Sequence, residues 1–415
     1  MRILIISTFF PSDLNTSTQG VYKRMGMFVE ALSKIAQLDV LFYVPSTVDT
    51  SPSAIKTQEY AFSQHWKTKV NLFLCPSSTH HQAVPKWKQK WDRAFSFFNQ
   101  NDFPANQDSL QLEAFETCLE RQPDAVFIHR LPAICPILAT QEKVPPIFFD
   151  LDDIEHIKFM RRLQQPPIRL QSLPNYLQIP ALWWGERQAI RSAQLTFVCS
   201  ELDRRYLTNK LNYKGVVTVP NAIAIPNPQP ITSEQTLLLI GGYYYHANLQ
   251  AANFLIEEVW PHIYPNLPNA RLLIAGPQPE KIRSYRSNIA GVEFLGFVDD
   301  LDALYQKSRV VCCPIFTGGG TRVKMIEAAA YGKAIVATEV GAEGLNFRDK
   351  SEFLLRNDPK AFADACLELL QNDSLCKKLG FSARQMAITF YDRTNVMNLI
   401  QQHIQAKNSD LPLSK

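Results

Sequence analysis

RVVCCPIFTGGGTRVKMIEAAAYGKAIVAT, residues 309–338, carries the pattern that decides the fold. The stretch begins with a continuous apolar run at 309–315, passes through three consecutive glycines and continues as a helical pattern at 322–331. A second apolar run follows at 333–338. Parallel strands need a crossover connection and are buried on both faces, so this order predicts a parallel βαβ unit.

The same alternation of short apolar runs and helical stretches extends outward over the whole chain. Further strands are predicted at 2–8, 38–44, 125–129, 146–150, 195–200, 216–220, 237–240, 270–276 and 292–296. Helices are predicted at 19–36, 182–192, 201–209, 248–260, 299–307, 359–371, 373–391 and 393–406. The predicted fold class is therefore α/β, with two Rossmann-like, doubly wound parallel-sheet domains.

The length of 415 residues suits two domains rather than one. The alternation is interrupted at 225–235, IPNPQPITSEQ, which contains three prolines and no apolar period. We therefore expect a first domain at 1–224, a linker at 225–235 and a second domain at 236–392. A final helix and tail follow at 393–415.

Composition excludes several classes of protein. Apolar residues make up 46% and charged residues 20%, which is close to the globular average. A net charge of +4 gives no footprint for nucleic acid, although it permits contact with an anionic membrane. The eight cysteines form no C-x-x-C motif, so we interpret them as reduced core thiols of a cytosolic protein. The start MRILIISTFFP is interpreted as a strand because no cleavage-site pattern follows it.

The glycine run at 318–320 indicates an anion site. It lies between a strand end and the start of a helix, where free backbone N–H groups and the helix dipole favour negative charge. Arg322 and Lys324 fall in the first helical turn, where an anion compensates their charge. A phosphate or diphosphate fits, and the Glu327 carboxylate could accept hydrogen bonds from ribose hydroxyls. The alternative is a tight structural turn with solvated charges.

Common cofactor motifs are missing from the sequence. No Walker A loop, protein-kinase signature or G-x-G-x-x-G after a first strand is present, which argues against a nicotinamide cofactor. The histidines form neither H-x-x-x-H nor H-E-x-x-H, so metal catalysis has little support. We expect no bound cofactor and no catalytic metal.

The stretch 314–345 resembles the donor-binding segment of the family 4 retaining glycosyltransferases, in particular a branch with a G-G-G-T-R-x-K loop. Weaker likenesses occur in the right order along almost the full length. They are the first strand with Gly20 after it, PDAVFIHR at 123–130, FVCSELDRRYL at 197–207, VVTVPN at 216–221, LLIAGPQP at 272–279, VEFLGFVDDLDALY at 292–305 and GAEGL at 341–345.

The resemblance implies the GT-B fold, in which two Rossmann-like domains face a cleft. The first domain would bind a saccharide or lipid-linked acceptor, and the second a nucleotide-diphosphate sugar as co-substrate. The final helix would cross back to the first domain. Sugar transfer would keep the anomeric configuration and need no metal. Two alternatives are a nucleotide-sugar epimerase of the same fold and a non-catalytic nucleotide-sugar-binding protein.

The resemblance also assigns residues. Glu327 matches the second glutamate of the family's paired motif, whereas the first falls on Gly319 and is missing. Many family members have Arg and Lys after the first strand of the second domain. The matching positions here are Tyr243 and Asn248, so Arg322 and Lys324 are the expected substitutes for those two cations. The expected catalytic residues are His129, Arg322 and Lys324. The expected donor-binding residues are Gly20, Gly242, Gly276, Phe297, Val298, Gly318, Gly319, Gly320, Thr321, Arg322, Lys324 and Glu327.

Three acids follow a predicted strand in FFDLDDIEH, namely Asp150, Asp152 and Asp153. A D-x-D pair can hold a divalent metal on a diphosphate. These acids belong to the first domain, far in sequence from the glycine run, so helix capping or acceptor contact is the preferred interpretation.

The stretch PKWKQKWDRAFSFF, 85–98, interleaves basic residues with aromatics that would share one helical face. Basic amphipathic helices with aromatic anchors bind membrane interfaces. A second basic stretch is KFMRR at 158–162. The alternative is an aromatic face packed on the first domain. The expected location is cytoplasmic, with peripheral contact at the inner face of the cell membrane under the first interpretation.

Overall fold

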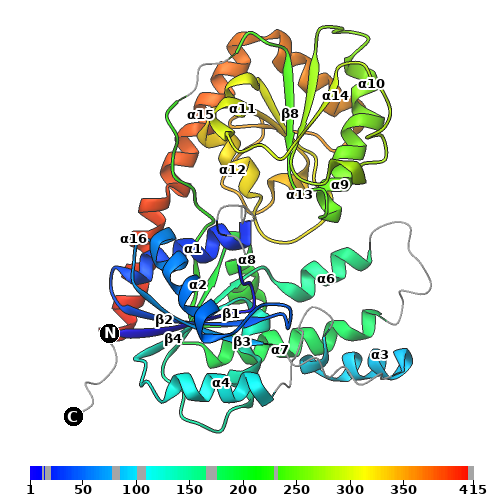
Figure 1. Ribbon diagram of the computed structural model, residues 1–415. Helices are drawn as coiled ribbons and strands as arrows, with labels where there is room; N and C mark the ends of the chain where they lie inside the picture. The colour runs from blue at the N-terminus through cyan, green and yellow to red at the C-terminus, as the bar shows by residue number, and fades with distance from the viewer. Residues whose placement is uncertain are drawn as a thin grey trace. The chain divides into compact units, whose positions relative to one another are not determined.

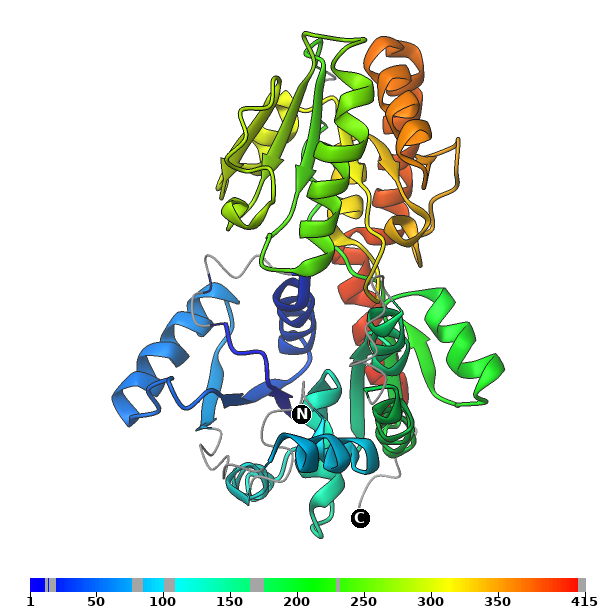
Figure 2. The same ribbon diagram turned by 90° about the vertical axis from the view of Figure 1, so that its right-hand side faces the viewer.

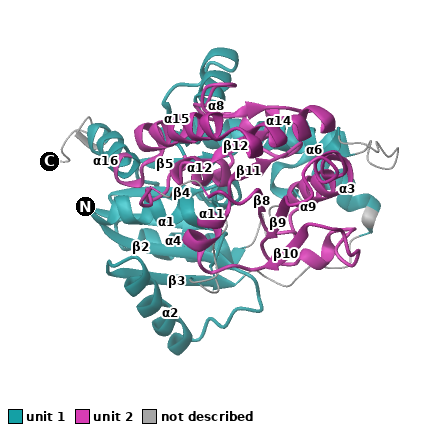
Figure 3. Cartoon of the chain, turned by 90° about the horizontal axis from the view of Figure 1, so that it is seen from above, with its two compact units in different colours: residues 1–220, 396–415 teal, residues 221–395 magenta. Residues whose placement is uncertain are grey.

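The chain divides into two compact units in the computed structural model, which describes residues 1–11, 14, 20–76, 85–100, 109–164, 175–228 and 232–409. Unit 1 comprises residues 1–220 and 396–415, and unit 2 comprises residues 221–395 (Figure 3). Each unit is built on its own parallel sheet. The predicted α/β class with two doubly wound domains is confirmed.

Unit 1 contains a seven-stranded sheet in the order β3-β2-β1-β4-β5-β6-β7. All six strand pairings are parallel, and the register places Ser7 opposite His129. The strands are β1 Arg2–Ser7, β2 Gln37–Val44, β3 Val70–Pro76, β4 Ala125–His129, β5 Ile147–Asp152, β6 Leu195–Val198 and β7 Val216–Thr218. Strand β3 was not predicted; it lies at the edge of the sheet, and three of its seven residues are buried.

Helices cover both faces of this sheet, with α1 and α4 on opposite sides of it (Figure 1). The helices are α1 Gly20–Ser33, α2 Pro52–His65, α3 Lys86–Phe95, η1 Phe97–Asn99, α4 Ser109–Leu119, η2 Leu131–Ile134, α5 Cys135–Ala139, α6 Glu155–Leu163, α7 Gln178–Ser192, α8 Glu201–Arg205 and η4 Tyr206–Lys210. Several begin at a side-chain cap, for example Ser51 before α2 and Ser200 before α8.

Unit 2 contains a six-stranded parallel sheet in the order β10-β9-β8-β11-β12-β13. Its strands are β8 Thr236–Ile240, β9 Arg271–Ala275, β10 Val292–Gly296, β11 Val310–Cys313, β12 Ala334–Ala337 and β13 Leu354–Leu355. Strands β11 and β12 are buried at every position, as expected of a parallel sheet covered on both faces.

The unit 2 helices follow their strands in doubly wound order. They are α9 His246–Asn253, η5 Phe254–Val259, α10 Trp260–Ile263, η6 Pro279–Lys281, α11 Leu301–Lys307, α12 Val323–Ala330, α13 Glu339–Ala342, α14 Pro359–Gln371 and α15 Asp373–Tyr391. Asp300, Asp358 and Asn372 accept hydrogen bonds at the starts of α11, α14 and α15. These contacts satisfy N–H groups that the helices leave free.

The last helix, α16 Arg393–Ser409, leaves unit 2 at its first turn, and from residue 396 onward the chain belongs to unit 1. The Gln401 side-chain amide donates to the carbonyl of Ala31 at 2.9 Å, and the Gln194 side-chain amide donates to the carbonyl of Lys407 at 3.4 Å. Residues 229–231 of the expected linker and the tail at 410–415 lie outside the described residues.

All eight cysteines are buried free thiols. Among the described residues, no helix combines the length and the apolarity needed to cross a bilayer.

Candidate functional site

The strand order of unit 2 reverses between β8 and β11, which pair side by side in parallel. Connections run outward on both sides of this point, so the loops after the two strands diverge and leave room at the carboxyl edge of the sheet. The glycine run at 318–320 and the pair at 241–242 both lie on these loops. The predicted anion site therefore lies at the usual ligand-binding edge of a doubly wound sheet.

The triple-glycine loop adopts a backbone that other residues rarely adopt. Gly318 and Gly320 have φ values of +117° and +63°. Arg322 is the residue that caps α12, and its Nη1 donates to the carbonyls of Gly319 and, at 3.1 Å, Gly320. The guanidinium group thus folds back over the loop and holds it in place.

Arg322 retains hydrogen-bonding capacity in this position. Its Nε and Nη2 atoms are buried and have no hydrogen-bond partner among the described residues. Buried polar groups without a partner are uncommon and costly, so an unpaired guanidinium edge requires an explanation. An anion bound at the start of α12 would satisfy both atoms, because the helix N-terminus and the cation favour it together.

Lys324, in the first turn of α12, is linked through Asn248 of α9 to the loop after β8. Its ammonium donates to the Asn248 side-chain oxygen at 2.7 Å, and the Asn248 amide donates to the carbonyl of Gly242 at 3.0 Å. Burial, together with the nearby Arg322 charge, lowers the pKa of Lys324. Gly241 leaves no room for a larger residue, since an added Cβ would lie 2.8 Å from Asn248 and 3.0 Å from the lysine nitrogen.

Gly276, directly after β9, allows the backbone there to pass very close to the backbone of Gly241. It has a φ of +133°, and a Cβ there would lie 2.0 Å from the carbonyl oxygen of Gly241. The buried Tyr243 hydroxyl donates to the carbonyl of Ala275 at 3.2 Å. Tyr243 therefore serves the packing between β8 and β9 and replaces no cation.

The remaining donor-loop residues lie along α12 and its start. Thr321 is buried, and its hydroxyl accepts a hydrogen bond of 2.9 Å from the Asn221 side-chain amide. Glu327 is half-buried one turn further along α12. Phe297 and Val298 follow β10 at the edge of the sheet, separated from β8 by β9, and Phe297 is exposed. The structure thus brings Gly242, the glycine run, Arg322 and Lys324 together, and Phe297 and Val298 follow Gly296, whose carbonyl accepts a hydrogen bond of 2.6 Å from the Gly276 N–H.

His129 and Gly20 belong to unit 1. Gly20 is the first residue of α1. His129 ends β4, is fully buried, and pairs through Nδ1 with the Ser7 hydroxyl at 2.9 Å. Its Nε2 has no hydrogen-bond partner among the described residues. Burial, with Arg130 and Arg24 nearby, lowers the pKa of His129 well below its ordinary value, so the imidazole is neutral at neutral pH.

The acids in the last part of β5 and directly after it form an ion-pair network with two buried arginines. Arg24 of α1 contacts Asp150 at 2.6 Å and Asp152 at 3.5 Å, and also donates to the carbonyl of Val219 at 2.9 Å. Arg130, directly after β4, lies 3.7 Å from Asp152 and 3.4 Å from Asp153. The sequence analysis preferred helix capping or acceptor contact for these acids and did not predict their ion pairs with the two arginines.

Two residues of this network have strained backbones. Asp152 has a φ of +59°, and Arg130 has φ 70° and ψ 158°, a region that is essentially reserved for glycine. Asp152 ends β5 and Arg130 directly follows β4, so both lie at the carboxyl edge of the unit 1 sheet, close to the point between β1 and β4 where its strand order reverses. Strain of this kind is concentrated at functional sites, and the edge is where such sheets bind ligands.

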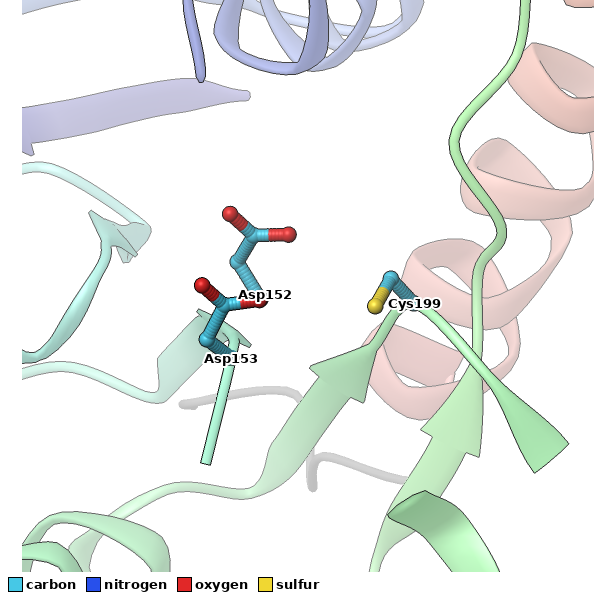
Figure 4. Close-up of side chains that lie close together, drawn as sticks. All are labelled: Asp152, Asp153 and Cys199. Carbon is cyan, nitrogen blue, oxygen red and sulfur yellow. The ribbon is translucent and has the colours of Figure 1, made fainter. Parts of the chain in front are cut away.

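Asp152, Asp153 and Cys199 offer three ligand atoms within 4.8 Å of one another at the ends of β5 and β6 (Figure 4). The donor set does not fit a divalent cation well. The Arg130 guanidinium already contacts both carboxylates. Burial, together with the neighbouring carboxylates, raises the pKa of Cys199 well above its ordinary value, so the thiol keeps its proton.

The basic aromatic stretch at 85–98 is only partly a helix. Helix α3 ends at Phe95, and Phe98 lies in the separate turn η1, so the prediction of four aromatics on one helical face is wrong for Phe98. Trp87, Trp91 and Phe95 are exposed, which contradicts the alternative of an aromatic face packed on the domain. The side chain of Lys86 lies outside the described part of the structure.

The family model described as "Glycosyl transferases group 1" matches residues 234–372. A curated relative, the phosphatidyl-myo-inositol mannosyltransferase of Mycobacterium leprae (strain TN), is 28% identical over 214 residues. The match covers 48% of this chain and 56% of the relative, so the chain spans about half the length of that protein.

Two solved structures show the fold over nearly the whole chain. A sucrose-phosphate synthase from Thermosynechococcus elongatus is 15% identical, with a TM-score of 0.70 and coverage of 99% of this chain and 100% of that one. Anabaena Alr3699/HepE in complex with UDP and glucose is 14% identical, with a TM-score of 0.65 and the same coverage. The predicted fold, two Rossmann-like domains as in the GT-B enzymes, is confirmed.

Proposed function

We propose that this chain is a group 1 glycosyltransferase that moves a sugar from a nucleotide-diphosphate sugar to a saccharide or glycolipid acceptor. In this proposal the anomeric configuration is retained and no metal ion takes part. The observation that carries the proposal is the unpaired, buried edge of Arg322 over the triple-glycine loop. The family match over 234–372 covers this loop and supports the assignment.

The leaving diphosphate accounts for the geometry of the loop. Two fixed cations, Arg322 and Lys324, lie at the start of α12, where backbone N–H groups also point toward an anion. Negative charge develops on the diphosphate as the sugar departs, and fixed positive groups stabilise that charge without reorganisation. Neutralisation by side chains would also make a divalent metal unnecessary.

The remaining residues receive matching roles. Glu327 binds the ribose hydroxyls, and backbone N–H groups of the glycine run replace the missing sugar-binding glutamate at Gly319. In a front-face mechanism the departing phosphate oxygen takes the acceptor proton, so no protein nucleophile is needed. His129 is neutral and therefore acts as a hydrogen-bonding group through Nε2 rather than as a cation.

The names of related proteins support the substrate classes. The HepE structure holds UDP and glucose, which supports a nucleotide-sugar donor. The mycobacterial relative is named for transfer of mannose to phosphatidyl-myo-inositol, which supports a glycolipid acceptor. A lipid-linked acceptor would place the enzyme at the inner face of the cell membrane.

A thermal-shift panel of nucleoside diphosphates and their sugar conjugates tests donor binding, since a ligand that binds only the folded state raises the melting temperature. We expect one nucleotide series to stabilise the wild type and to lose this effect in Arg322→Ala. Failure of every nucleotide to stabilise the protein would refute the proposal.

Turnover then separates the possible activities. Transfer requires an acceptor, whereas an epimerase converts the nucleotide sugar alone, and a binding protein converts nothing. We expect product only when a saccharide or glycolipid acceptor is present, with the configuration of the donor linkage kept in the product and full activity in excess chelator. If an epimer of the nucleotide sugar forms without acceptor, the protein is an epimerase and the proposed transfer activity is wrong.

A further inference from the structure

Three helices of unit 1, α3, α6 and α7, lie together (Figure 1 and Figure 2). Helices α3 and α6 both pack on α7. His156 of α6 bonds to the buried Glu186 of α7 through both its backbone N–H and its ring. Helix α6 is therefore attached to α7 through a buried contact.

Helix α3 is attached by the residue beyond its end and not by its aromatic face. The Phe97 ring lies flat on Gly185 of α7, so closely that a Cβ at Gly185 would lie 1.7 Å from the ring. Gln100 closes the turn by donating to the carbonyls of Arg93 at 2.7 Å and Ser96 at 3.0 Å. With this anchor in place, the aromatic face of α3 is left to solvent.

That aromatic face is large and regular. Trp87, Trp91 and Phe95 follow one another at four-residue spacing and are 66%, 54% and 77% exposed. The Trp91 and Phe95 rings are stacked with centroids 5.6 Å apart. On the neighbouring helix, Trp184 is 51% exposed. Contiguous exposed apolar groups mark an interaction surface, because leaving them in water costs free energy.

Cations surround the aromatic face. A helix advances about 100° per residue, so the exposed Lys88 and Lys90 flank the aromatic stripe on either side. Neither lysine forms an ion pair within the described part of the chain. The Arg187 guanidinium lies 5.8 Å from the Trp184 ring. The basic α6 adds Arg161 and Arg162 on the other side of α7.

We propose that the exposed face of α3, together with Trp184, docks on an anionic lipid surface. Tryptophan and phenylalanine enter the boundary between head groups and acyl chains, and the flanking lysines meet anionic head groups. A second copy of this chain fits less well, because two such faces would bring like charges together. The proposal is independent of the donor site, so transfer to a soluble acceptor can succeed where docking fails.

The test uses sedimentation of the full chain with vesicles of phosphatidylcholine, with and without 30 mol% phosphatidylglycerol. We expect binding to the anionic vesicles at low salt, weak binding to the neutral ones, and release as salt screens the charges. Lys88→Glu with Lys90→Glu should weaken the partition coefficient by about tenfold or more. Trp87→Ser with Trp91→Ser and Phe95→Ser should weaken it similarly even at low salt.

Matched controls lie on α2 of the same unit. Tyr60 is 68% exposed and Lys56 is also exposed, so Tyr60→Ser and Lys56→Glu change the same chemistry away from α3 and should leave binding intact. Absence of binding to anionic vesicles at low salt would overturn the proposal. So would equal losses in the α2 controls, or a wild-type dimer that the α3 aromatic variants convert to monomer. A melting temperature close to that of the wild type confirms that each variant is folded.

Discussion

The Lys324 ammonium donates a hydrogen bond of 2.7 Å to the side-chain oxygen of Asn248, which joins the first turn of α12 to the first turn of α9. In the family that the sequence resembles, a cation often occupies the position of Asn248 itself. Here the charge reaches that place from the first turn of α12. The local motif therefore supplies the cation, and a tertiary contact with Asn248 positions it.

This contact leads to a prediction about pH. Burial lowers the pKa of Lys324 below its ordinary 10.5, so the ammonium loses its proton earlier than an exposed lysine as the pH rises. A bound diphosphate favours the charged form, and its affinity should therefore fall as the pH rises toward and through the lowered pKa. Titration of the preferred nucleoside diphosphate from pH 7.5 to 10 measures this fall. In Lys324→Arg the guanidinium stays charged, and the profile should be flatter; a flat profile in the wild type would contradict the role.

Arg322→Ala should lower turnover by roughly 100-fold or more, because one fixed donor at a developing charge is worth about 2.7–4 kcal/mol. The fold should survive, since the side-chain hydrogen bonds of Arg322 within the described residues go to the carbonyls of Gly319 and Gly320, in the same loop. Initial rates and melting temperature measure both effects. Arg283→Ala, which removes a guanidinium with 71% exposure in the same unit, is the matched control and should keep normal rates. Near-normal transfer by Arg322→Ala would remove its catalytic role.

His129→Ala should lower transfer by roughly tenfold or more, because a hydrogen bond to a developing charge is worth about 1.5–3 kcal/mol. Ser7→Ala removes the partner of Nδ1, together with the acceptor of the Phe9 N–H, and leaves Nε2 in place, so it should affect turnover less. Rates of donor hydrolysis and transfer, each corrected for folded protein, provide the measurement. If both variants lower the melting temperature but leave corrected rates unchanged, His129 serves only the packing of β1 and β4.

Sequence patterns predicted the parts of this molecule that depend on local order. Continuous apolar runs located strands such as β11 and β12, and the glycine run located the start of α12. The pattern could not reveal Arg24, which lies 126 residues from its partner Asp150, because long-range ion pairs leave no periodic signal. It likewise predicted an amphipathic α3, but the choice between packing and exposure depended on Phe97 meeting Gly185, a contact between distant segments.

Asp152→Asn should change how stability depends on pH. Burial and the neighbouring Asp153 carboxylate raise the pKa of Asp152 to about 7, although two guanidinium groups lie nearby. The folded state thus binds a proton that the unfolded state releases near pH 4, and this contribution to stability is lost as the pH rises toward 7. The asparagine variant does not titrate. Its free energy of unfolding relative to the wild type should therefore increase by a few kcal/mol between pH 4 and 8.

Urea unfolding across this range provides the measurement, followed by tryptophan fluorescence. Five of the six tryptophans lie in unit 1, so the signal mainly reports the unit that contains Asp152. Asp299→Asn, at an exposed position of unit 2, controls for the substitution itself. Parallel curves for wild type and Asp152→Asn would show that the carboxylate is ionised throughout.

Arg130 allows backbone strain to be separated from ion pairing. Arg130→Ala and Arg130→Gly both lose the contacts with Asp152, Asp153 and Glu155, so both should be less stable than the wild type. The two variants differ in backbone strain. The conformation at position 130, with φ 70° and ψ 158°, destabilises a residue that has a Cβ by about 1–3 kcal/mol, whereas it costs glycine little. The glycine variant should therefore unfold with a free energy about 1 kcal/mol higher than that of the alanine variant.

The same pair of substitutions at Arg191, an exposed residue in the last turn of α7, should give the opposite order, because alanine is the better helix former by about 1 kcal/mol. A reversal of sign between the two positions would isolate the strain at Arg130 from any general effect of glycine. If alanine is the more stable at both positions, the Arg130 backbone is relaxed in solution. If the order reverses, position 130 has an arginine although glycine would adopt this backbone with less strain. The strained backbone then places a positive charge at the carboxyl edge of the unit 1 sheet.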